Sequence, residues 1–430
     1  MVIEEGDSAN RTVPNDAISV RKNIITTTPR TGSNGVPMRA QIFHPTPAVL
    51  DPTKGIRREP VRPLEYQSTD FSAQFDFDTL FFDSFFDNSG THLILVAPPL
   101  LNLASLVEKM EVTALPYGQR CPFRIKNMDR HSQVWVTISY PTTEFVIRTE
   151  VGEFQIAPGD NYSNLFSGQR VLLTLSKNNR LEWIQDWLRY NRDIHGANAV
   201  LFYDNFSTRY SAEVLLSALV EVSGFDRICV VMWPFKYGPQ GLDATRFWDS
   251  DFCQIGVLEH ARWRFLQRAR SVLNSDIDEL VVSSNGSSVF ETVERSWSGV
   301  VRFHGVWVYG FLDQTQVISE PEPLRYTAFN HYLRPPPKRK WRIIPVFRGE
   351  CPPKWAAVPR RCPVNAQWTA HSINDWRGAR GVTSCFCYRH FKEINDHWKY
   401  NRSDRENFDA DRFVYDRSMV SNFDHVNWGT

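Results

Sequence analysis

Apolar runs alternate with amphipathic segments throughout the second half of the chain. Continuous apolar runs, typical of strands buried on both faces, lie at 170–175, 199–204 and 228–233, and a fourth lies within 271–282. Helical spacing fills the intervals, first at Leu181, Ile184 and Leu188, then across 214–222, and then across 252–270. This alternation predicts an α/β domain built on a Rossmann-type parallel sheet with helices on both faces.

Local signals predict the two ends of the first helix. Asn179 is followed three positions later by Glu182, which resembles a capping box at a helix start. Gly196 follows the last apolar position and is expected to end the helix, because glycine readily takes the left-handed conformation found there.

An earlier region, from about residue 90 to 165, follows a period of two instead. Val134, Val136, Ile138 and Tyr140 alternate with other positions, and turn residues separate further short apolar segments. This pattern predicts a small antiparallel β domain that precedes the α/β domain.

The change of pattern suggests where the domains begin and end. Residues 1–65 are rich in Pro, Thr, Arg and Asn without an apolar period, so we expect a disordered or loosely packed arm. The β-rich domain is expected at 66–168 and the α/β domain at 169–430. Only Ser167 and Gly168 break the pattern between them, which is too short for a flexible linker and predicts that the two domains pack together.

The composition limits the cellular compartment and the binding partners that we expect. Lys plus Arg number 49 against 48 Asp plus Glu, so the net charge of +1 predicts no general attraction to nucleic acid or to acidic membranes. Seven cysteines, an odd number without a C-x-x-C pair, are expected to be reduced thiols and not a zinc site. No apolar run of transmembrane length occurs, and residues 1–10 are acidic and polar. We therefore expect a cytoplasmic protein. The pattern is also compatible with peripheral binding to a membrane surface.

Polar residues gather where the predicted strands end. The first strand runs into residues 176–179, the second into Asp204 and Asn205, and the fourth into Asp276, Ile277, Asp278 and Glu279. Ligands bind outside the carboxyl ends of strands in such sheets, so these clusters are expected to share one crevice. The two carboxylates of the D-x-D pair could hold one divalent cation, and the alternative is an ordinary acidic turn.

Several segments together resemble glycosyltransferase family 92. They are "NNRLEWIQDWLRYNRDIHGANAVLFYDNFST", "VMWPFKYGP", "SDIDELV", and the late "WTAHSI" and "CYRHF", and they cover roughly residues 170–395. The resemblance implies a GT-A type fold and a metal-dependent, inverting transfer of a sugar. The implied donor is a nucleotide sugar, expected to be a UDP-sugar with galactose suggested, and the implied acceptor is a carbohydrate or another hydroxyl. The implied cofactor is Mn²⁺ or Mg²⁺.

The resemblance also assigns roles to residues. Asp276 and Asp278 would bind the metal, with His371 as the third ligand, because imidazole suits manganese. Lys177, Asn178 and Asn179 would line the nucleotide pocket. Two of these assignments have plainer alternatives, since His371 could be structural and Asn179 could only cap the helix.

Two further residues are assigned to the donor in the same way. Asp204 would accept a hydrogen bond from uracil or ribose, and the alternative is an aspartate that only shapes a turn. Arg389 would pair with the diphosphate, and the alternative is a salt bridge. A basic run at 338–342 could close on the phosphates or could simply be solvated.

Inversion requires a base that deprotonates the acceptor hydroxyl. The candidates are Asp313, Glu320, Glu322 and Asp375, of which we choose Glu322. Trp307 and Tyr309 could stack on the acceptor sugar or could pack in the core.

Two other functional classes stay open from the sequence. One is a non-catalytic carbohydrate-binding protein on a degenerate GT-A fold, against which the intact Asp276/Asp278 pair argues. The other is a nucleotidyltransferase, which usually carries a glycine-rich loop after the first strand. Here that place reads "SKNNRLEW" and contains no glycine.

Overall fold

The computed structural model describes residues 39–311, 324–334, 351–374, 383–394 and 408–429. Its main feature is an 11-stranded sheet. Five parallel strands form one half of this sheet, in the order β1 (Arg39–Phe43), β14 (Arg227–Met232), β13 (Ala199–Asp204), β12 (Arg170–Ser176) and β15 (Ser271–Asn274). The predicted parallel core is therefore present, and four of its five strands, all except β1, lie at the predicted places.

The other half of the sheet is mixed and was not predicted. Antiparallel β19 (Cys351–Ala357) pairs with β15 and is followed by β17 (Val300–Tyr309), β18 (His331–Leu333) and β23 (Phe413–Tyr415). Off this path, β16 (Glu279–Ser283) pairs antiparallel with β22 (Phe386–Phe391), which runs parallel to β17. The segment expected to hold one fourth strand thus holds two, β15 and β16, because the Asp276–Asp278 turn separates them.

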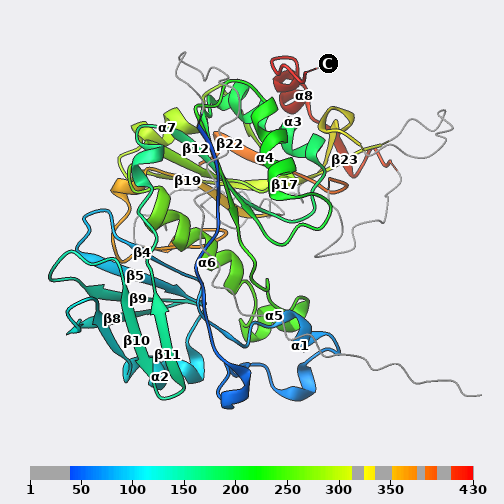
Figure 1. Ribbon diagram of the computed structural model, residues 1–430. Helices are drawn as coiled ribbons and strands as arrows, with labels where there is room; N and C mark the ends of the chain where they lie inside the picture. The colour runs from blue at the N-terminus through cyan, green and yellow to red at the C-terminus, as the bar shows by residue number, and fades with distance from the viewer. Residues whose placement is uncertain (1–38, 312–323, 335–350, 375–382, 395–407, 430) are drawn as a thin grey trace, which may run out of the picture.

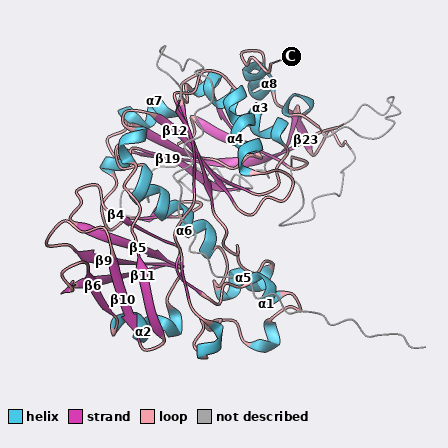
Figure 2. Cartoon of the chain, in the orientation of Figure 1, coloured by secondary structure: helices cyan, strands magenta, loops and turns pink. Residues whose placement is uncertain are grey.

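Helices cover one face of the large sheet (Figure 2). They are α3 (Leu181–His195), α4 (Ala212–Glu221), α7 (Val289–Arg295) and α8 (Arg417–Phe423), whose apolar side chains share one core with the sheet. The predicted end of α3 is confirmed, because Gly196 closes it with φ 73°. The predicted capping box is wrong: Arg180 is the N-cap residue, and the Asn179 amide instead donates to Ser176 Oγ at 2.9 Å.

The opposite face carries α6 (Phe252–His260), its π-helical continuation Ala261–Phe265, and part of the β domain. Figure 1 shows α6 between the large sheet and the strands of that domain. The prediction of helices on both faces therefore holds only in part, because part of the β domain also covers this second face. Phe85, Ile94 and Trp135 of the β domain share a core with α6 and the large sheet, so the predicted packing of the two domains is confirmed.

The β domain is antiparallel, as predicted. One sheet contains β4 (Asp83–Phe86), β5 (His92–Ala97), β9 (His131–Thr137) and β8 (Phe123–Met128), and the other contains β11 (Gly152–Ile156), β10 (Phe145–Thr149), β6 (Glu111–Ala114) and β7 (Gln119–Arg120). Val134 and Val136 lie in its core, with Ile138 and Tyr140 packed against it. Short elements complete the fold: α1 (Phe71–Gln74), α2 (Ala104–Glu108), α5 (Leu242–Phe247), and the pairs β2 (Ala48–Val49) with β3 (Thr79–Phe81) and β20 (Gln367–Trp368) with β21 (Ile373–Asn374).

The expected loose arm does not extend to residue 65. Strand β1, dark blue in Figure 1, forms the edge of the large sheet beside β14. Farther along, the buried Arg58 guanidinium donates to the carbonyls of Pro99, Asp76 and Thr79. Arg62 forms a buried ion pair with Asp249 at 2.8 Å. Only the part of the arm before residue 39 lies outside the described residues.

Two sequence expectations concern the chain as a whole. All seven cysteines are free in the structure. Across the described ranges, no helix combines the length and the apolar character needed to cross a bilayer.

Candidate metal and nucleotide site

The candidate site lies where the strand order of the sheet reverses. The chain proceeds outward from β12 through β13 to β14 and then returns to the other side of β12 with β15. Ligands of open α/β sheets bind at the carboxyl ends of the strands on either side of such a reversal. Asp204 ends β13, and Asp276 and Asp278 follow β15, so the structure brings these predicted residues to the same edge.

Three ligand-capable side chains meet at this edge. His390 pairs with Glu279 across β22 and β16, and its Nε2 lies 2.9 Å from Asp278 Oδ2. One ligand atom from each of Asp278, Glu279 and His390 falls within 4.8 Å of the others. Trp307 stacks on the His390 ring at 4.0 Å between centroids and so restricts its orientation.

The cluster suits a divalent cation by both spacing and chemistry. Metal bonds to oxygen and nitrogen are about 2.0–2.2 Å long, so ligand atoms of one ion lie roughly 3–4.5 Å apart. The ligand atoms of the two carboxylates and the imidazole lie within 4.8 Å of one another, close to this spacing. Carboxylates suit Mg²⁺ and Mn²⁺, and the imidazole shifts the preference toward Mn²⁺.

Lys354 balances part of this negative charge. Its ammonium lies 2.6 Å from Asp276 Oδ2 and 3.0 Å from Glu279 Oε2, and its side chain is 2% exposed. Burial lowers the pKa of Lys354, but the two carboxylates outweigh it and raise the pKa overall, so the residue stays charged. Burial also raises the pKa of Glu279, against the effect of Lys354. Asp276 is therefore paired with the Lys354 ammonium, whereas Asp278 faces His390.

His371 does not join this cluster. The residue as a whole is exposed, but protein atoms surround much of the ring, and Nδ1 lies 3.3 Å from the Pro353 carbonyl oxygen. Surrounding protein atoms and the Lys354 ammonium lower the pKa of His371 to about 4, while Asp276 and Asp251 act in the opposite direction. Sequence reasoning placed Glu279 at this edge without a ligand role and missed His390, although both stand in the quoted motifs "SDIDELV" and "CYRHF".

Asp204 is the second notable carboxylate at this edge. It is 1% exposed, and its Oδ2 accepts the Ser207 N–H at 3.0 Å. Its Oδ1 is buried and has no hydrogen-bond partner. Burial raises the pKa of Asp204, which the Ser207 hydrogen bonds and the nearby Lys177 charge partly offset. A buried oxygen without a donor is costly, so this position favours a ligand that brings an N–H or O–H group.

Asn178 organises the loop beside Asp204. Its Oδ1 accepts the backbone N–H groups of Thr208 at 2.7 Å and Arg209 at 3.2 Å. Its own N–H donates to Ser207 Oγ at 2.8 Å, and its φ is 57°. Asn178 thus joins the ends of β12 and β13, which is a positioning role for the predicted pocket residue.

Arg389 lies in a salt bridge away from the cluster. Its guanidinium pairs with Asp416, with one contact at 3.1 Å, and also donates to the Cys387 carbonyl at 3.1 Å. Neighbouring residues of a strand point to opposite faces, so Arg389 and His390 project away from each other. Arg389 thus forms the salt bridge of the alternative interpretation, and its assignment to the diphosphate stays a prediction.

The remaining predicted residues fall into two groups: those that the structure describes and those that lie outside the described residues. Trp307 contacts His390, and Tyr309 is buried against Phe413 at 5.0 Å between ring centroids. Glu322, the other candidate bases Asp313, Glu320 and Asp375, and the basic run 338–342 lie outside the described residues.

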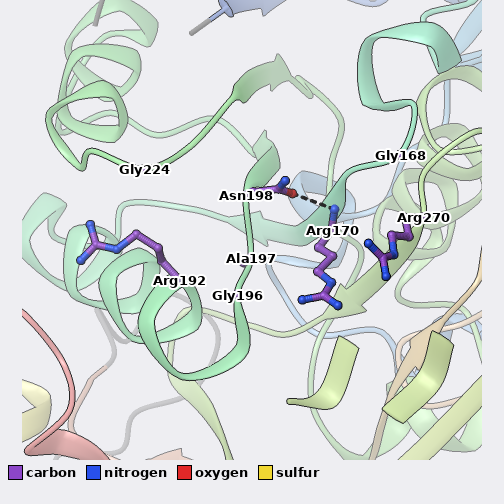
Figure 3. A pocket seen from close by; sticks show the side chains of 8 residues that line it. All are labelled: Gly168, Arg170, Arg192, Gly196, Ala197, Asn198, Gly224 and Arg270. Carbon is purple, nitrogen blue, oxygen red and sulfur yellow. Dashed lines mark hydrogen bonds between the residues drawn. The ribbon is translucent and has the colours of Figure 1, made fainter. Parts of the chain in front are cut away.

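An arginine-lined cavity of about 340 Å³ lies at the opposite edge of the sheet (Figure 3). Arg170, Arg192 and Arg270 line it, close to the amino ends of the parallel strands. Carboxylates offset part of their charge: Arg170 and Arg270 share Glu294 at 2.9 and 2.7 Å, and Arg192 pairs with Asp193 at 2.6 Å. None of the three residues of the candidate metal cluster lines this cavity.

Comparisons with known proteins leave the family open. No model of a protein family matches this chain, and no curated protein does. Among solved structures, the galactosyltransferase LgtC, in complex with donor and acceptor sugar analogues, is 12% identical over 32% of this chain, with a TM-score of 0.23. That match spans about half, 47%, of the galactosyltransferase chain. A predicted RNA methyltransferase from Thermotoga maritima is 8% identical over 35% of this chain and 67% of its own, with a TM-score of 0.11. Both TM-scores are too low to support an argument about fold or function.

Proposed function

We propose that this protein is a metal-dependent glycosyltransferase that uses a nucleotide-sugar donor. The observation that carries the proposal is the cluster of Asp278, Glu279 and His390 at the strand-order reversal of a doubly wound sheet. The sequence resemblance to glycosyltransferase family 92 supports the reaction class, because "SDIDELV" and "CYRHF" supply all three residues. UDP as the nucleotide and inversion as the stereochemical course follow from the resemblance alone.

Each residue of the edge has a role in this proposal. Asp278, Glu279 and His390 would hold a divalent cation, which would neutralise the charge that develops on the leaving diphosphate. Lys354 keeps Asp276 and Glu279 in place by its two ion pairs. The partnerless Oδ1 of Asp204 would accept a hydrogen bond from the nucleoside. Asn178 holds the loop that carries this pocket.

The structure also bears on the two alternative classes. A degenerate, non-catalytic fold has no need for three ligand-capable side chains at one point, yet they are present. A nucleotidyltransferase or dinucleotide-binding protein usually binds phosphates on a glycine-rich turn after the first strand. The turn after β12 contains no glycine and is instead fixed by the Asn178 side chain.

Calorimetry of UDP binding in the presence of MnCl₂ tests the proposal. The wild type should bind UDP only with the metal, and Asp278→Asn and His390→Ala should each weaken this binding by about tenfold or more. Asp424→Asn and His425→Ala, at exposed positions beyond α8, are the matched controls and should bind like the wild type. Metal-independent binding, or unchanged affinity in both site variants, would contradict the metal assignment.

A screen of nucleotide sugars then identifies the donor. Slow hydrolysis without an acceptor, measured with and without manganese, should select one sugar and one base. If no nucleotide sugar is hydrolysed although UDP binds with metal, the non-catalytic alternative replaces the transferase.

A further inference from the structure

The β domain reaches the rim of the candidate site through one hairpin tip. The turn between β8 and β9 holds Asp129 and Arg130. The Asp129 N–H donates to Gln367 Oε1 at 3.0 Å, and the Gln367 amide donates back to the Asp129 carbonyl. Gln367 begins the β20–β21 hairpin, so the tip is bonded to the α/β domain at a defined place.

That hairpin in turn lies beside the metal-ligand turn. Between β20 and β21, the Ala370 carbonyl accepts the Asn274 side-chain amide at 3.0 Å, two residues before Asp276. His371, also in this loop, contacts the Pro353 carbonyl next to Lys354. The Arg130 tip is thus connected to the Asp276 turn through a single loop.

Arg130 supports an exposed tryptophan at this rim. The Arg130 guanidinium carbon lies 4.8 Å from the centroid of the Trp248 ring, which is 58% exposed at the end of α5. The guanidinium is held from both sides by Asp129 and Asp251, each at 3.3 Å. Trp248 is therefore presented to solvent on a fixed support.

The backbone is strained at the same place. Trp248, Arg130 and Asp251 have φ of 52°, 55° and 64°, a left-handed conformation that side chains other than glycine rarely take. Such outliers gather at ligand and active sites. Two further outliers, Asn178 and Phe206, lie in the loops after β12 and β13 at the carboxyl edge of the sheet. Five of the six non-glycine outliers among the described residues therefore lie in these segments, and the sixth, Leu101, lies elsewhere.

We propose that Trp248 is the stacking platform for a neutral sugar ring of the acceptor. A pyranose ring has a face of C–H groups, which fits the negative face of an indole. Asp129 and Asp251, which pair with the Arg130 guanidinium over this ring, would accept hydrogen bonds from sugar hydroxyls. Two carboxylates around one guanidinium leave a local charge near −1, which disfavours phosphorylated or acidic ligands.

The inference rests on the proposed transferase function, and it adds a subsite to which the β domain contributes. The test uses the full chain and an array of neutral, sialylated and phosphorylated oligosaccharides, probed with UDP and MnCl₂ present. The wild type should bind neutral glycans. Trp248→Ala should lower this binding at least tenfold, and Trp248→Phe should restore part of it. Trp297→Ala is the matched control, because Trp297 is 78% exposed in the turn before β17, away from this rim.

Manganese-dependent hydrolysis of the nucleotide sugar is measured in parallel, since it reports on the donor site alone. We expect Trp248→Ala to hydrolyse donor within twofold of the wild type, with an unchanged melting temperature. Wild-type glycan binding by Trp248→Ala, or binding restricted to acidic glycans, would overturn the platform while donor hydrolysis stands. Glycan binding that depends on Trp248 in a protein that hydrolyses no nucleotide sugar would support the saccharide site and remove the transferase proposal.

Discussion

His390 Nε2 lies 2.9 Å from Asp278 Oδ2, although the two residues are 112 positions apart in the sequence. Their approach depends on the antiparallel register of β16 and β22, which places His390 opposite Glu279. The backbone contributes as well, because the Phe391 N–H donates to the Asp278 carbonyl at 2.8 Å. The ligand geometry is therefore a property of this strand pair.

The first prediction separates the two histidines of the metal assignment. His390→Ala should raise the manganese concentration at half-saturation of activity by about tenfold or more, because it removes a ligand. His371→Ala should leave this value unchanged, because its ring faces the Pro353 carbonyl. Manganese titrations of both variants, with melting temperatures as a check on folding, decide the question. The opposite ranking would return His371 to the metal site.

Gly305 should be required for the position of β22. A β-carbon at Gly305 would lie 2.3–2.5 Å from Tyr388 ring atoms, far inside contact distance. Because Tyr388 pairs with Gly305 across the strands and is two residues from His390, Gly305→Ala should displace the metal ligand. We expect a loss of about 1–3 kcal/mol in stability and a weaker manganese affinity. Gly286→Ala is a useful contrast, because its φ of 73° strains the backbone although its β-carbon would meet no atom within 4 Å. It should lose stability without changing manganese affinity.

The sequence placed part of the site because strand ends are local features. Asp204, Asp276 and Asp278 each follow an apolar run directly, and topology alone brings such positions to one edge. His390 could not be found this way, since its place depends on the register of a distant strand pair. Arg389, one position earlier, attracted the assignment only because its chemistry suits phosphate. The alternation of the strand decides that it faces Asp416 instead.

The limits of the fold prediction have the same origin. The parallel core followed from long apolar runs, whereas β1 is a short segment whose pairing with β14 is not visible in its own composition. The antiparallel strands β19 and β22 likewise lie beyond the regular strand–helix alternation. The predicted arm includes residues 39–65 because the segment is polar and lacks an apolar period. Its Arg58 and Arg62 are nevertheless buried, with partners from other segments.

Phe43 tests whether this N-terminal segment belongs to the fold. Its ring contacts Tyr162 at 4.5 Å and Phe265 at 5.2 Å between centroids, and it packs against the core below the sheet. Phe43→Ala should therefore reduce the free energy of unfolding by about 1–3 kcal/mol in urea denaturation. The exposed Tyr66→Ala should change it much less. A loosely attached segment would show no effect of the Phe43 substitution.

Buried histidines predict a loss of stability in mild acid. His195 Nε2 lies 2.7 Å from the Val281 carbonyl, and Nδ1 accepts the Val289 N–H at 3.3 Å, so the ring is held neutral. Burial lowers its pKa from 6.5 to about 4. The unfolded state then binds more protons, so this stability is present above pH 6.5 and is lost as the pH falls toward 4. Urea denaturation between pH 8 and 4 should show the loss, with a smaller slope in His195→Gln.

The last prediction concerns the ion pair that joins the two domains. Asp83 on β4 accepts the His260 Nε2–H at 2.7 Å and also pairs with Arg264, and all three side chains are buried. Tyr203 lies 2.7 Å from His260 Nδ1, which places the neutral ring between a donor and an acceptor. Burial raises the pKa of Asp83, but Arg264 and His260 outweigh this and lower it overall. The pair therefore stabilises the fold above the ordinary pKa of an aspartate, and this contribution is lost as the pH falls below it.

Asp83→Asn should leave the Arg264 charge buried without its partner, at a cost of about 3–5 kcal/mol. The matched control is Asp78→Asn, whose ion pair with Arg57 is largely solvated and should contribute about 0–1 kcal/mol. Because Tyr203 directly precedes Asp204, Asp83→Asn should also weaken UDP binding, measured where the variant is still folded. Equal melting temperatures for the two variants would mean that this buried ion pair contributes little to the packing of the two domains, and UDP affinity should then be unaffected.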